Sequence, residues 1–375
     1  MNISPTTPQA ERSLGQDAAA WRSAELESAM EHWLIELDEY ERAALIDTVR
    51  AGRRTGYSVL EYRQSDFPFP PAALEKIRRA LHETQHGLGL ALVRGLPRED
   101  VEEEEFELLT WAIGLHLGVA RPQDRMSRYI NRVQDIGTNY RSPTGRGYSS
   151  SAELDFHVDG SDVVMLSCYN QAPVGGDSMC ASAIAAWRQL SSERPDLAET
   201  LREPLPFSRQ GEQAEGMEAF RMMPVFGEQD GNVFCMWVRN RVEQGEKLPG
   251  APAITPLQRE AMDLLDAIVR RPEFMYRMRL QPGDLQFMSN FTALHSRTEF
   301  QDADDPRAKR LLYRLWLSTP DSPRLPPLWD GFYESLEPGV VRGGAYGQHY
   351  DDTCRRFDTD QSRVMNMHLG PGPTV

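Results

Sequence analysis

The chain has 375 residues, 40% of them hydrophobic, and its 41 basic and 56 acidic residues give a formal net charge of −15. This balance repels nucleic-acid backbones and anionic membrane surfaces, and no apolar run approaches the ~18 residues that a membrane span needs. The composition therefore predicts a globular protein with ample material for a core and with no nucleic-acid or membrane partner.

The four cysteines are scattered along the chain without a paired spacing. They are Cys168, Cys180, Cys235 and Cys354. This pattern is typical of free thiols in a reducing cytosol and not of a disulfide framework or a cysteine zinc site. The N-terminus also lacks the basic and then apolar segments of a secretory signal, so we expect a cytoplasmic protein.

Two segments precede the predicted main domain. Residues 1–20 are rich in Ser, Thr, Pro, Gln and Ala, which predicts a mobile tail with little to bury. Residues 21–65 carry apolar side chains at helical spacing, among them Trp33, Leu34 and Leu37. This spacing predicts one or two amphipathic helices, which we interpret as an N-terminal helical extension.

Residues 66–325 alternate helical and strand-like segments and form the predicted main domain. Helices are expected at 70–86, after the acidic stretch 99–105, at 181–190 and at 256–268, where Thr255 and Gln258 form a capping box. Strands are expected at 90–93, 129–133, 163–169, 274–280, 285–288 and 311–317, and short strands between 204 and 240. This order is typical of a mainly antiparallel β core, over which the Pro- and Gly-rich residues 326–375 are expected to form an irregular C-terminal wrap.

A long polar segment, residues 121–151, leads into a candidate metal motif. Tyr140, Arg141, Arg146 and Tyr148 are its candidate substrate contacts. Long irregular segments in compact domains are often binding loops or lids. An ordinary surface loop accounts for the same composition equally well, and both interpretations stay open.

His157 and Asp159 stand two residues apart at the head of an apolar run. Residues i and i+2 of an extended segment project to the same side, so a nitrogen and an oxygen can bind one metal ion. Chance alone places about one such pair in a chain with 8 histidines and 56 acidic residues. A second pair, His349 and Asp351, is followed by one further histidine, His368, and no arginine comes after His368 in the sequence. We therefore set this pair aside.

His295 can complete the site, because two neutral imidazoles and one carboxylate leave three positions of an octahedral metal open. This arrangement suits non-heme Fe(II), with two positions for a keto acid and the third for O₂. A cation must then hold the far carboxylate of the keto acid. Arg310 and Arg314 lie four residues apart around a strand start, so they face the same way and can each make a bidentate carboxylate contact.

Each of these residues also has an ordinary structural interpretation. A single buried histidine is more often a hydrogen-bonded core residue than a ligand. Arg310 or Arg314 can also pair with the nearby Asp302, Asp304 or Asp305. Taken as an ordered set in a strand-rich chain, the residues favour the metal-site interpretation.

This ordered set resembles the taurine dioxygenase (TauD/TfdA-like) family of Fe(II)- and 2-oxoglutarate-dependent oxygenases. It consists of His157 with Asp159, the run GGDSMCASAIAAW, the run GDLQFMSNFTALH that ends at His295, and the run RLLYRLWL. The resemblance covers roughly residues 90–318. It implies an α+β fold with a mainly β core, a double-stranded β-helix (jelly roll) with flanking helices and the metal between its two sheets.

By this resemblance the two histidines and the aspartate bind Fe(II), Ser178 contacts 2-oxoglutarate, and Arg310 pairs with the distal carboxylate of that cosubstrate. Arg314 then points toward the primary substrate. The taurine-binding residues of the family have no match in the loop before the motif, so taurine itself is not predicted. Further candidates for supporting or substrate contacts are Asp162, Gln286, Asn290 and Arg297.

The leading hypothesis is an oxygenase that couples oxidative decarboxylation of 2-oxoglutarate to hydroxylation, or another oxidation, of a small metabolite. We expect this substrate to be anionic or amino-acid-like, and succinate and CO₂ to be released. Fe(II), 2-oxoglutarate and O₂ are the expected cofactor and cosubstrates. Because Asp159 occupies a ligand position, no place is left for chloride, and halogenation is disfavoured.

Two other functional classes stay open, a zinc-dependent hydrolase with the same ligands and a non-catalytic jelly-roll binding protein. The hydrolase lacks a His-Glu-x-x-His base and leaves the arginine pair unexplained. Neither the primary substrate nor the choice between monomer and homo-oligomer follows from the sequence.

Overall fold

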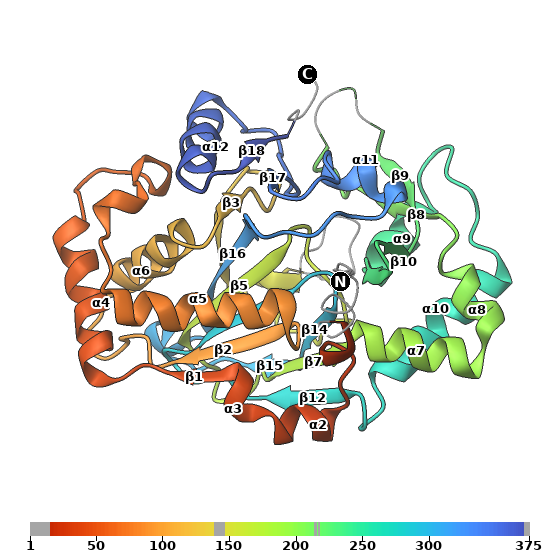
Figure 1. Cartoon of the computed structure of the whole chain (residues 1–375), viewed down its shortest axis with the longest axis horizontal. Helices are drawn as coiled ribbons and strands as arrows, with labels where there is room; N and C mark the ends of the chain where they lie inside the picture. The colour runs from red at the N-terminus through yellow and green to blue at the C-terminus, as the bar shows by residue number, and fades with distance from the viewer. Residues whose placement is uncertain (1–15, 139–146, 214–215, 217, 371–375) are drawn as a thin grey trace, which may run out of the picture.

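The computed structural model describes residues 16–138, 147–213, 216 and 218–370, and β-sheets make its centre (Figure 1). The largest sheet has seven strands in the order β1-β2-β13-β5-β16-β3, with β4 also paired to β16. All neighbours are antiparallel except β1 with β2. The strands are β1 (Leu34–Glu36), β2 (Leu90–Arg94), β3 (Val119–Arg121), β4 (Ile130–Val133), β5 (Val163–Asn170), β13 (Leu285–Ser289) and β16 (Leu311–Ser318).

A smaller sheet of three antiparallel strands, in the order β12-β7-β14, forms the other wall. Its strands are β7 (Ser178–Ser182), β12 (Met275–Met278) and β14 (Ala293–Arg297). Leu92 and Val164 of the larger sheet share one buried cluster with Cys180 and Met278 of the smaller sheet, so the two sheets enclose a common interior. The expected double-stranded β-helix is confirmed.

The side chains of β16 alternate between the two faces of the larger sheet. Tyr313 and Leu315 pack into the cluster beneath the helices, whereas Leu312 and Trp316 face the interior. Since strand side chains have a period of two, Arg314 belongs to the interior set. It lines a pocket there together with Arg310.

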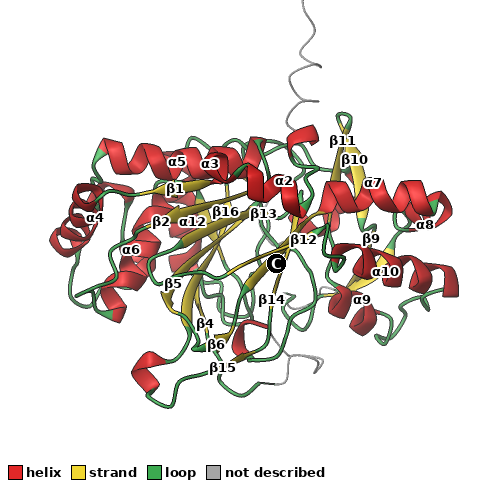
Figure 2. Cartoon of the chain, turned by 90° about the horizontal axis from the view of Figure 1, so that it is seen from below, coloured by secondary structure: helices red, strands yellow, loops and turns green. Residues whose placement is uncertain are grey.

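Four helices lie against the larger sheet on the side away from the interior (Figures 1 and 2). They are α4 (Glu39–Gly52), α5 (Pro71–His86), α6 (Glu103–Leu115) and α12 (Asp352–Val364). Ile77, Leu109 and Phe357 of these helices join Phe287 and Tyr313 of the sheet in one buried cluster. This apolar layer fixes the sheet from behind, so its inner face is left for a site.

A second lobe is inserted between β7 and β12, which are hydrogen-bonded neighbours in the smaller sheet (Figure 2). It contains α7 (Ala183–Glu193), α8 (Pro195–Thr200), α9 (Arg239–Gly245), α10 (Pro256–Val269) and the strand pairs β8 (Leu205–Ser208) with β9 (Phe220–Met223) and β10 (Phe226–Gln229) with β11 (Asn232–Cys235). The expected capping box of α10 is present, because the Thr255 hydroxyl accepts from the Gln258 N–H at 3.2 Å and the Gln258 side chain accepts from the Thr255 N–H at 3.0 Å. The remaining short elements are α2 (Ser23–Ser28), α3 (Met30–Trp33), β6 (Val174–Gly175), β15 (Phe300–Gln301), α11 (Asp330–Tyr333), β17 (Val340–Val341) and β18 (His368–Leu369).

The start of the described chain differs from the expectation of a tail followed by a separate helical extension. Within residues 16–20, the Gln16 side-chain amide donates to the Val233 carbonyl at 2.8 Å, and Ala19 is 2% exposed. The expected helix through Leu34 is wrong, because this segment pairs with β2 as strand β1. Pairing with a buried strand satisfies backbone groups and buries Ile35, which outweighs the helical spacing.

The C-terminal segment is not irregular throughout, because it contains α12. Asp351 caps this helix, since its carboxylate accepts from the N–H groups of Thr353 at 2.9 Å and Cys354 at 3.1 Å. Further along the helix, Asp358 forms a buried ion pair with Arg121 at 2.8 Å. The segment is therefore docked to the domain by a helix.

The four cysteines are buried and unpaired, which confirms the expected free thiols. Among the described residues, no helix has the length and apolar character that crossing a bilayer requires.

A buried ion pair ties the C-terminal segment to the loop that follows Asp159. Arg342 Nε donates to Asp162 Oδ1 at 2.7 Å, and the two side chains are 0% and 1% exposed. The Asp162 carboxylate also accepts from the Thr319 N–H at 2.9 Å. Asp162, a candidate for supporting contacts, thus anchors the chain and does not line the pocket.

Replacing Arg342 with Ala leaves the Asp162 carboxylate buried without its partner, so we expect a loss of about 3–5 kcal/mol in the free energy of unfolding. Arg324→Ala is the matched control, because Arg324 pairs with Glu337 at 2.7 Å on the surface, with side chains 45% and 55% exposed. The control should lose less than about 1 kcal/mol. Urea unfolding of both variants measures the difference, and equal losses would contradict the anchoring role.

Candidate functional site

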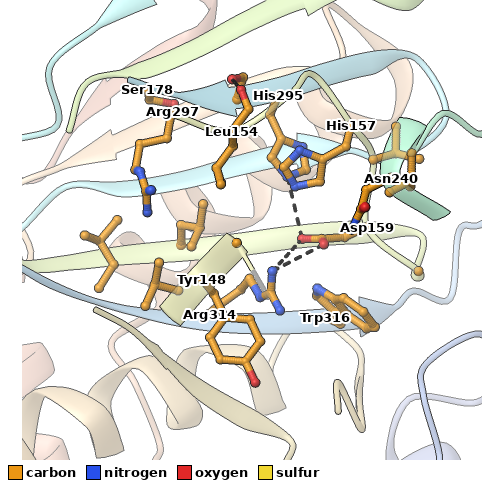
Figure 3. Close-up of a pocket in the computed structure, with 18 of the residues that line it drawn as sticks. Tyr148, Leu154, His157, Asp159, Ser178, Asn240, His295, Arg297, Arg314 and Trp316 are labelled. Atoms are coloured by element: carbon orange, nitrogen blue, oxygen red, sulfur yellow. Dashed lines mark hydrogen bonds and ion pairs between the residues drawn. The ribbon is translucent and has the colours of Figure 1, made fainter. Parts of the chain in front are cut away.

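Two chain segments bring two imidazoles and a carboxylate together in the interior (Figure 3). One potential ligand atom from each of His157, Asp159 and His295 lies within 4.8 Å of the other two. The imidazole rings are 4.3 Å apart between centroids, and His295 Nε2 lies 3.6 Å from Asp159 Oδ2. Within the described part of the chain, this is the only group of three or more His, Cys, Asp or Glu side chains arranged to hold a metal ion.

Backbone pairing places the first histidine beside the second. The N–H of His157 donates to the carbonyl of His295 and the reverse bond is also made, both at 2.9 Å. The Nδ1 of His157 lies 2.8 Å from the Asp155 carbonyl, which can only accept, so Nδ1 carries the proton and the lone pair is on Nε2. Burial, together with the charge of His295, lowers the pKa of His157 to about 4. The ring is therefore neutral near pH 7, which is the form that binds metals.

Asp159 is a buried anion between the imidazoles and a guanidinium. Its side chain is 7% exposed, and Arg314 Nη1 lies 3.3 Å from both carboxylate oxygens. Burial alone raises the pKa of Asp159, but the charge of Arg314 and the contact with His295 outweigh it and hold the pKa well below its usual range. Figure 3 shows the imidazoles on one side of this carboxylate and the guanidinium on the other.

The residues present fit a small divalent cation. Two nitrogens and one carboxylate oxygen are the donor set of non-heme Fe(II) sites with open positions, and the same set also binds Zn²⁺. Metal–ligand bonds of about 2.0–2.2 Å allow one ion to contact all three side chains after small rotations. The carboxylate supplies the negative charge that such an ion requires.

Asn290, predicted as a substrate contact, has a different role. Its side chain is fully buried, and its amide oxygen accepts from the Asp159 N–H at 2.9 Å while its Nδ2 donates to Ser161 Oγ at 3.2 Å. It does not line the pocket. The substrate assignment is therefore corrected, because the side chain holds the backbone of the Asp159 loop and is covered by protein.

Arg310 lies in another part of the same pocket and has no carboxylate partner among the described side chains. It is 3% exposed, its Nε donates to Gln171 Oε1 at 3.0 Å, and its Nη1 is buried without a partner in the described chain. The Asp302 carboxylate accepts only the Arg310 backbone N–H, so the expected alternative pairing of the side chain is absent there. Burial lowers the pKa of Arg310 to about 10.

The glycine turn of the sequence motif makes room for this guanidinium. A Cβ on Gly176 would lie 2.9 Å from Arg310 Nε, and its φ of +75° also favours glycine. Ser178, two residues on, lines the pocket and hydrogen-bonds to the Gln286 side chain at 3.2 Å. A buried cation, a hydroxyl and an amide thus meet in one polar corner.

Arg314 is fixed by contacts on several sides. Its Nε donates to Gln123 Oε1 at 2.8 Å, and its guanidinium lies 5.2 Å from the Tyr148 ring and 5.0 Å from the Trp316 ring. The Trp316 Nε1–H is buried without a partner in the described chain, and Trp316 lines the pocket. Arg314 therefore pairs with Asp159, not with the acidic residues at 302–305.

The remaining predicted residues divide into those the structure places and those it does not describe. Tyr148 and Arg297 line the pocket, and Arg297 Nη2 also donates to the Ser150 carbonyl at 2.7 Å, which holds the segment before the motif. Tyr140, Arg141 and Arg146 lie outside the described residues.

Sequence reasoning missed the wall that α9 and the C-terminal segment contribute. Asn240, Arg241 and Phe332 line the pocket there but belong to no motif near the ligands. Trp316, by contrast, could have been found, because it lies two residues after Arg314 on the same strand face.

Comparison with known proteins identifies the family. The sequence model of the "Taurine catabolism dioxygenase TauD, TfdA family" matches residues 55–316, which is more than half of the chain. The chain belongs to this family. The expected family and the enzyme class, a dioxygenase, are confirmed.

Known proteins of similar sequence or structure match most of the chain. FR-33289 synthase from Streptomyces rubellomurinus is 29% identical over 314 residues, which are 82% of this chain and 91% of that protein. Among solved structures, the non-heme iron oxygenase OrfP in complex with Fe and alpha-ketoglutaric acid has a TM-score of 0.57 at 18% identity, covering 76% of this chain and 94% of OrfP. Asparagine oxygenase with Fe(II), 2S,3S-3-hydroxyasparagine and succinate gives the same values. At this identity the two structures support the TauD-like fold.

Removing the Asn290 side chain should weaken Fe(II) binding by about 10–100-fold, because the Asp159 loop loses the hydrogen bond that orients it. Asn290→Ala is compared with Asn232→Ala in the β10–β11 hairpin, outside the pocket lining, which should bind Fe(II) like the wild type. Anaerobic calorimetric titration of Fe(II) into both variants measures the effect. Equal affinity in the two variants would contradict the supporting role.

Proposed function

We propose that this chain is an Fe(II)- and 2-oxoglutarate-dependent dioxygenase that hydroxylates, or otherwise oxidises, a small anionic or amino-acid-like metabolite. The observation that carries the proposal is one pocket with two opposed features. His157, Asp159 and His295 converge in it, and the partly unpaired guanidinium of Arg310 lies in it as well. A metal site and a separate anion site are what a keto acid that chelates a metal requires.

The three converging side chains would hold the iron. When bound there, Fe(II) supplies the activation of O₂ that oxidises the substrate, while 2-oxoglutarate is converted to succinate and CO₂. The chain keeps the donors ready for this role, since His157 is neutral and presents Nε2, and Asp159 stays ionised beside Arg314. Arg314 also screens the negative charge of the site.

Arg310 would bind the distal carboxylate of 2-oxoglutarate, with Ser178 and Gln286 as neighbouring polar groups. Burial makes this cation costly when it is left without an anion, and a carboxylate would satisfy its open Nη1. Leu166, Leu280 and Leu312 line the same pocket and exclude water from the methylene groups of the cosubstrate.

The primary substrate would bind on the side of Asp159 where Tyr148, Arg314 and Trp316 lie (Figure 3), with Asn240 lining the same pocket near His157. This wall offers a cation, an unpaired indole N–H and aromatic faces, which suit a small polar molecule. The similar structure of asparagine oxygenase supports the same substrate class, since it holds 2S,3S-3-hydroxyasparagine and succinate. The structure of OrfP with alpha-ketoglutaric acid supports the cosubstrate. Tyr140 and Arg141 remain predicted substrate contacts.

The zinc hydrolase is the weaker alternative. It would use the same three ligands but gives no reason for a buried Arg310 with an open N–H, and the family to which the chain belongs is one of dioxygenases. A cytoplasmic location stays part of the proposal and is supported by four buried free thiols.

Anaerobic addition of Fe(II) and 2-oxoglutarate should produce the weak visible charge-transfer band of a metal-chelated keto acid, which a zinc hydrolase cannot give. Asp159→Ala should abolish this band and substrate-dependent succinate formation, because one of three protein ligands is lost. Asp321→Ala, which removes an exposed carboxylate, is the control and should keep both. An Asp159→Ala variant that retains the band and wild-type turnover would show that the site is elsewhere.

The two arginines should separate by role. Removing a guanidinium from a buried carboxylate pair costs about 3–5 kcal/mol, so Arg310→Ala should weaken 2-oxoglutarate binding by a factor of roughly hundreds or more. Arg314→Ala leaves the distal contact in place and should instead lose coupling to the primary substrate. Calorimetric titration of 2-oxoglutarate into the Fe(II)-loaded variants tests this.

Arg277→Ala is the matched control for these titrations, because Arg277 is 56% exposed and pairs with Asp177 outside the pocket. Its affinity for 2-oxoglutarate should match the wild type. Equal losses in the Arg310 and Arg314 variants would contradict the separate roles, and no loss in Arg310→Ala would remove its assignment to the cosubstrate.

A further inference from the structure

A second pocket adjoins the candidate active site, and three arginines of the inserted lobe line it. Arg209 follows β8, Arg221 lies on β9 and Arg241 lies on α9. Arg241 lines the first pocket as well, and so does Gly160, the residue after Asp159. The two pockets therefore meet next to the carboxylate of the metal site.

Gly160 keeps the passage between the pockets open. A Cβ at this position would lie 3.0 Å from the Phe332 ring and 3.4 Å from the Trp316 ring, and both rings line both pockets. A side chain here would close the space between the rings. A small molecule is thus within reach of the metal site and the arginines at the same time.

The hydrogen bonds within the protein leave these guanidiniums incompletely satisfied. Arg209 Nη2 and Arg221 Nη1 both donate to one acceptor, the Gly331 carbonyl, at 3.2 and 2.7 Å. The Nε atoms of both arginines are buried without a partner in the described chain. Arg241 Nη2 donates to Glu212 Oε2 at 3.1 Å. Arg241 Nη1 also donates to the Ser208 carbonyl at 3.3 Å. The Nε donors of Arg209 and Arg221 thus remain unsatisfied by the described chain.

The charges that line this pocket are also unbalanced. The described lining residues supply three guanidiniums but two carboxylates, Glu212 and Glu334, while Glu218 and Asp159 act on Arg209 and Arg241 from outside the lining. Glu334 accepts from the Tyr346 hydroxyl at 2.6 Å, and burial raises its pKa. Burial, reinforced by the charges of the other two arginines, lowers the pKa of Arg221 well below its ordinary value. Such an assembly is unfavourable by itself and is stabilised by an added anion.

We propose that this second pocket binds the dianionic phosphate or phosphonate group of the primary substrate, while the carbon to be oxidised faces His157, Asp159 and His295. The proposal rests on the oxygenase function proposed above and names its substrate class. A planar carboxylate is satisfied by one bidentate guanidinium, whereas three guanidiniums lining one pocket can match the three oxygens of a tetrahedral phosphorus group. The charge of Asp159 acts on Arg241, which indicates how close the two sites are.

The test uses the full chain and two probes with a phosphorus group, methylphosphonate and methyl phosphate, in calorimetric titrations at pH 8. Methanesulfonate has the same tetrahedral shape with one charge, and acetate is the planar monoanion. At least one phosphorus probe should bind about tenfold or more tightly than methanesulfonate and acetate, because both of its charges meet the arginine cluster. The tighter of the two phosphorus probes tells a phosphonate from a phosphate ester.

Arg221→Gln and Arg209→Gln should each weaken that binding by roughly ten- to a hundredfold, which is the loss of one or two charged hydrogen bonds. Arg221→Lys keeps the charge and should recover part of the affinity, which a merely structural role would not predict. Arg202→Gln, on the surface of the same lobe at 38% exposure, is the control and should bind like the wild type. Thermal melting checks that each variant is folded, and the Arg209 variant serves if Arg221→Gln unfolds.

No binding of either phosphorus probe, equal binding of methanesulfonate, or wild-type affinity in both glutamine variants would overturn the proposal. Its failure is distinct from failure of the oxygenase function, because these titrations need neither Fe(II) nor 2-oxoglutarate. A wild-type protein that shows the charge-transfer band but binds no phosphorus probe keeps the oxygenase function and loses this substrate class. A wild-type protein that binds a phosphorus probe but shows no charge-transfer band keeps the anion site and loses the oxygenase function.

Discussion

The chemistry of this protein depends on one pair of backbone hydrogen bonds, between His157 and His295. Each residue donates to the carbonyl of the other at 2.9 Å, so a segment without regular structure continues the smaller sheet beside β14. The pairing sets the two imidazoles side by side, and the period of two then places Asp159 next to them. Strand pairing thereby positions the metal ligands, and it holds them more rigidly than a loop would.

This register places charged side chains in the interior, where their burial costs free energy when no ligand is bound. Asp159, Arg310 and Arg314 are charged groups between two sheets, where burial penalises each of them. The ion pair with Arg314 offsets part of the desolvation cost of Asp159. Gln123 accepts one N–H of Arg314, and Gln171 accepts one N–H of Arg310. The Nη1 donor of Arg310 has no partner in the described chain, and a keto-acid carboxylate would satisfy it. A cation would satisfy the ligand atoms of His157, Asp159 and His295.

The sequence predicted the parts of the fold and site that depend on local pattern. The spacing of His157 with Asp159, Arg314 on β16 with Arg310 just before that strand, and the capping box of α10 were predicted from a period or a cap, and the structure places both arginines in the pocket and forms the cap. Leu34 and Asn290 were misassigned because long-range contacts decide them, strand pairing with β2 and a hydrogen bond to the Asp159 backbone. A single sequence carries no local signal for such partners.

The inserted lobe lies directly beside the metal ligands. It enters between β7 and β12, which are neighbours in the smaller sheet, and its Val238 pairs with His157 while the Val158 N–H donates to the Trp237 carbonyl at 3.0 Å. The lobe also lines the space beside Asp159, through Asn240 and Arg241 on α9. Side chains of the lobe therefore shape the space beside the metal ligands, while strand pairing at β14 positions His157 and His295. The arginines of the second pocket lie on this lobe, next to the same space.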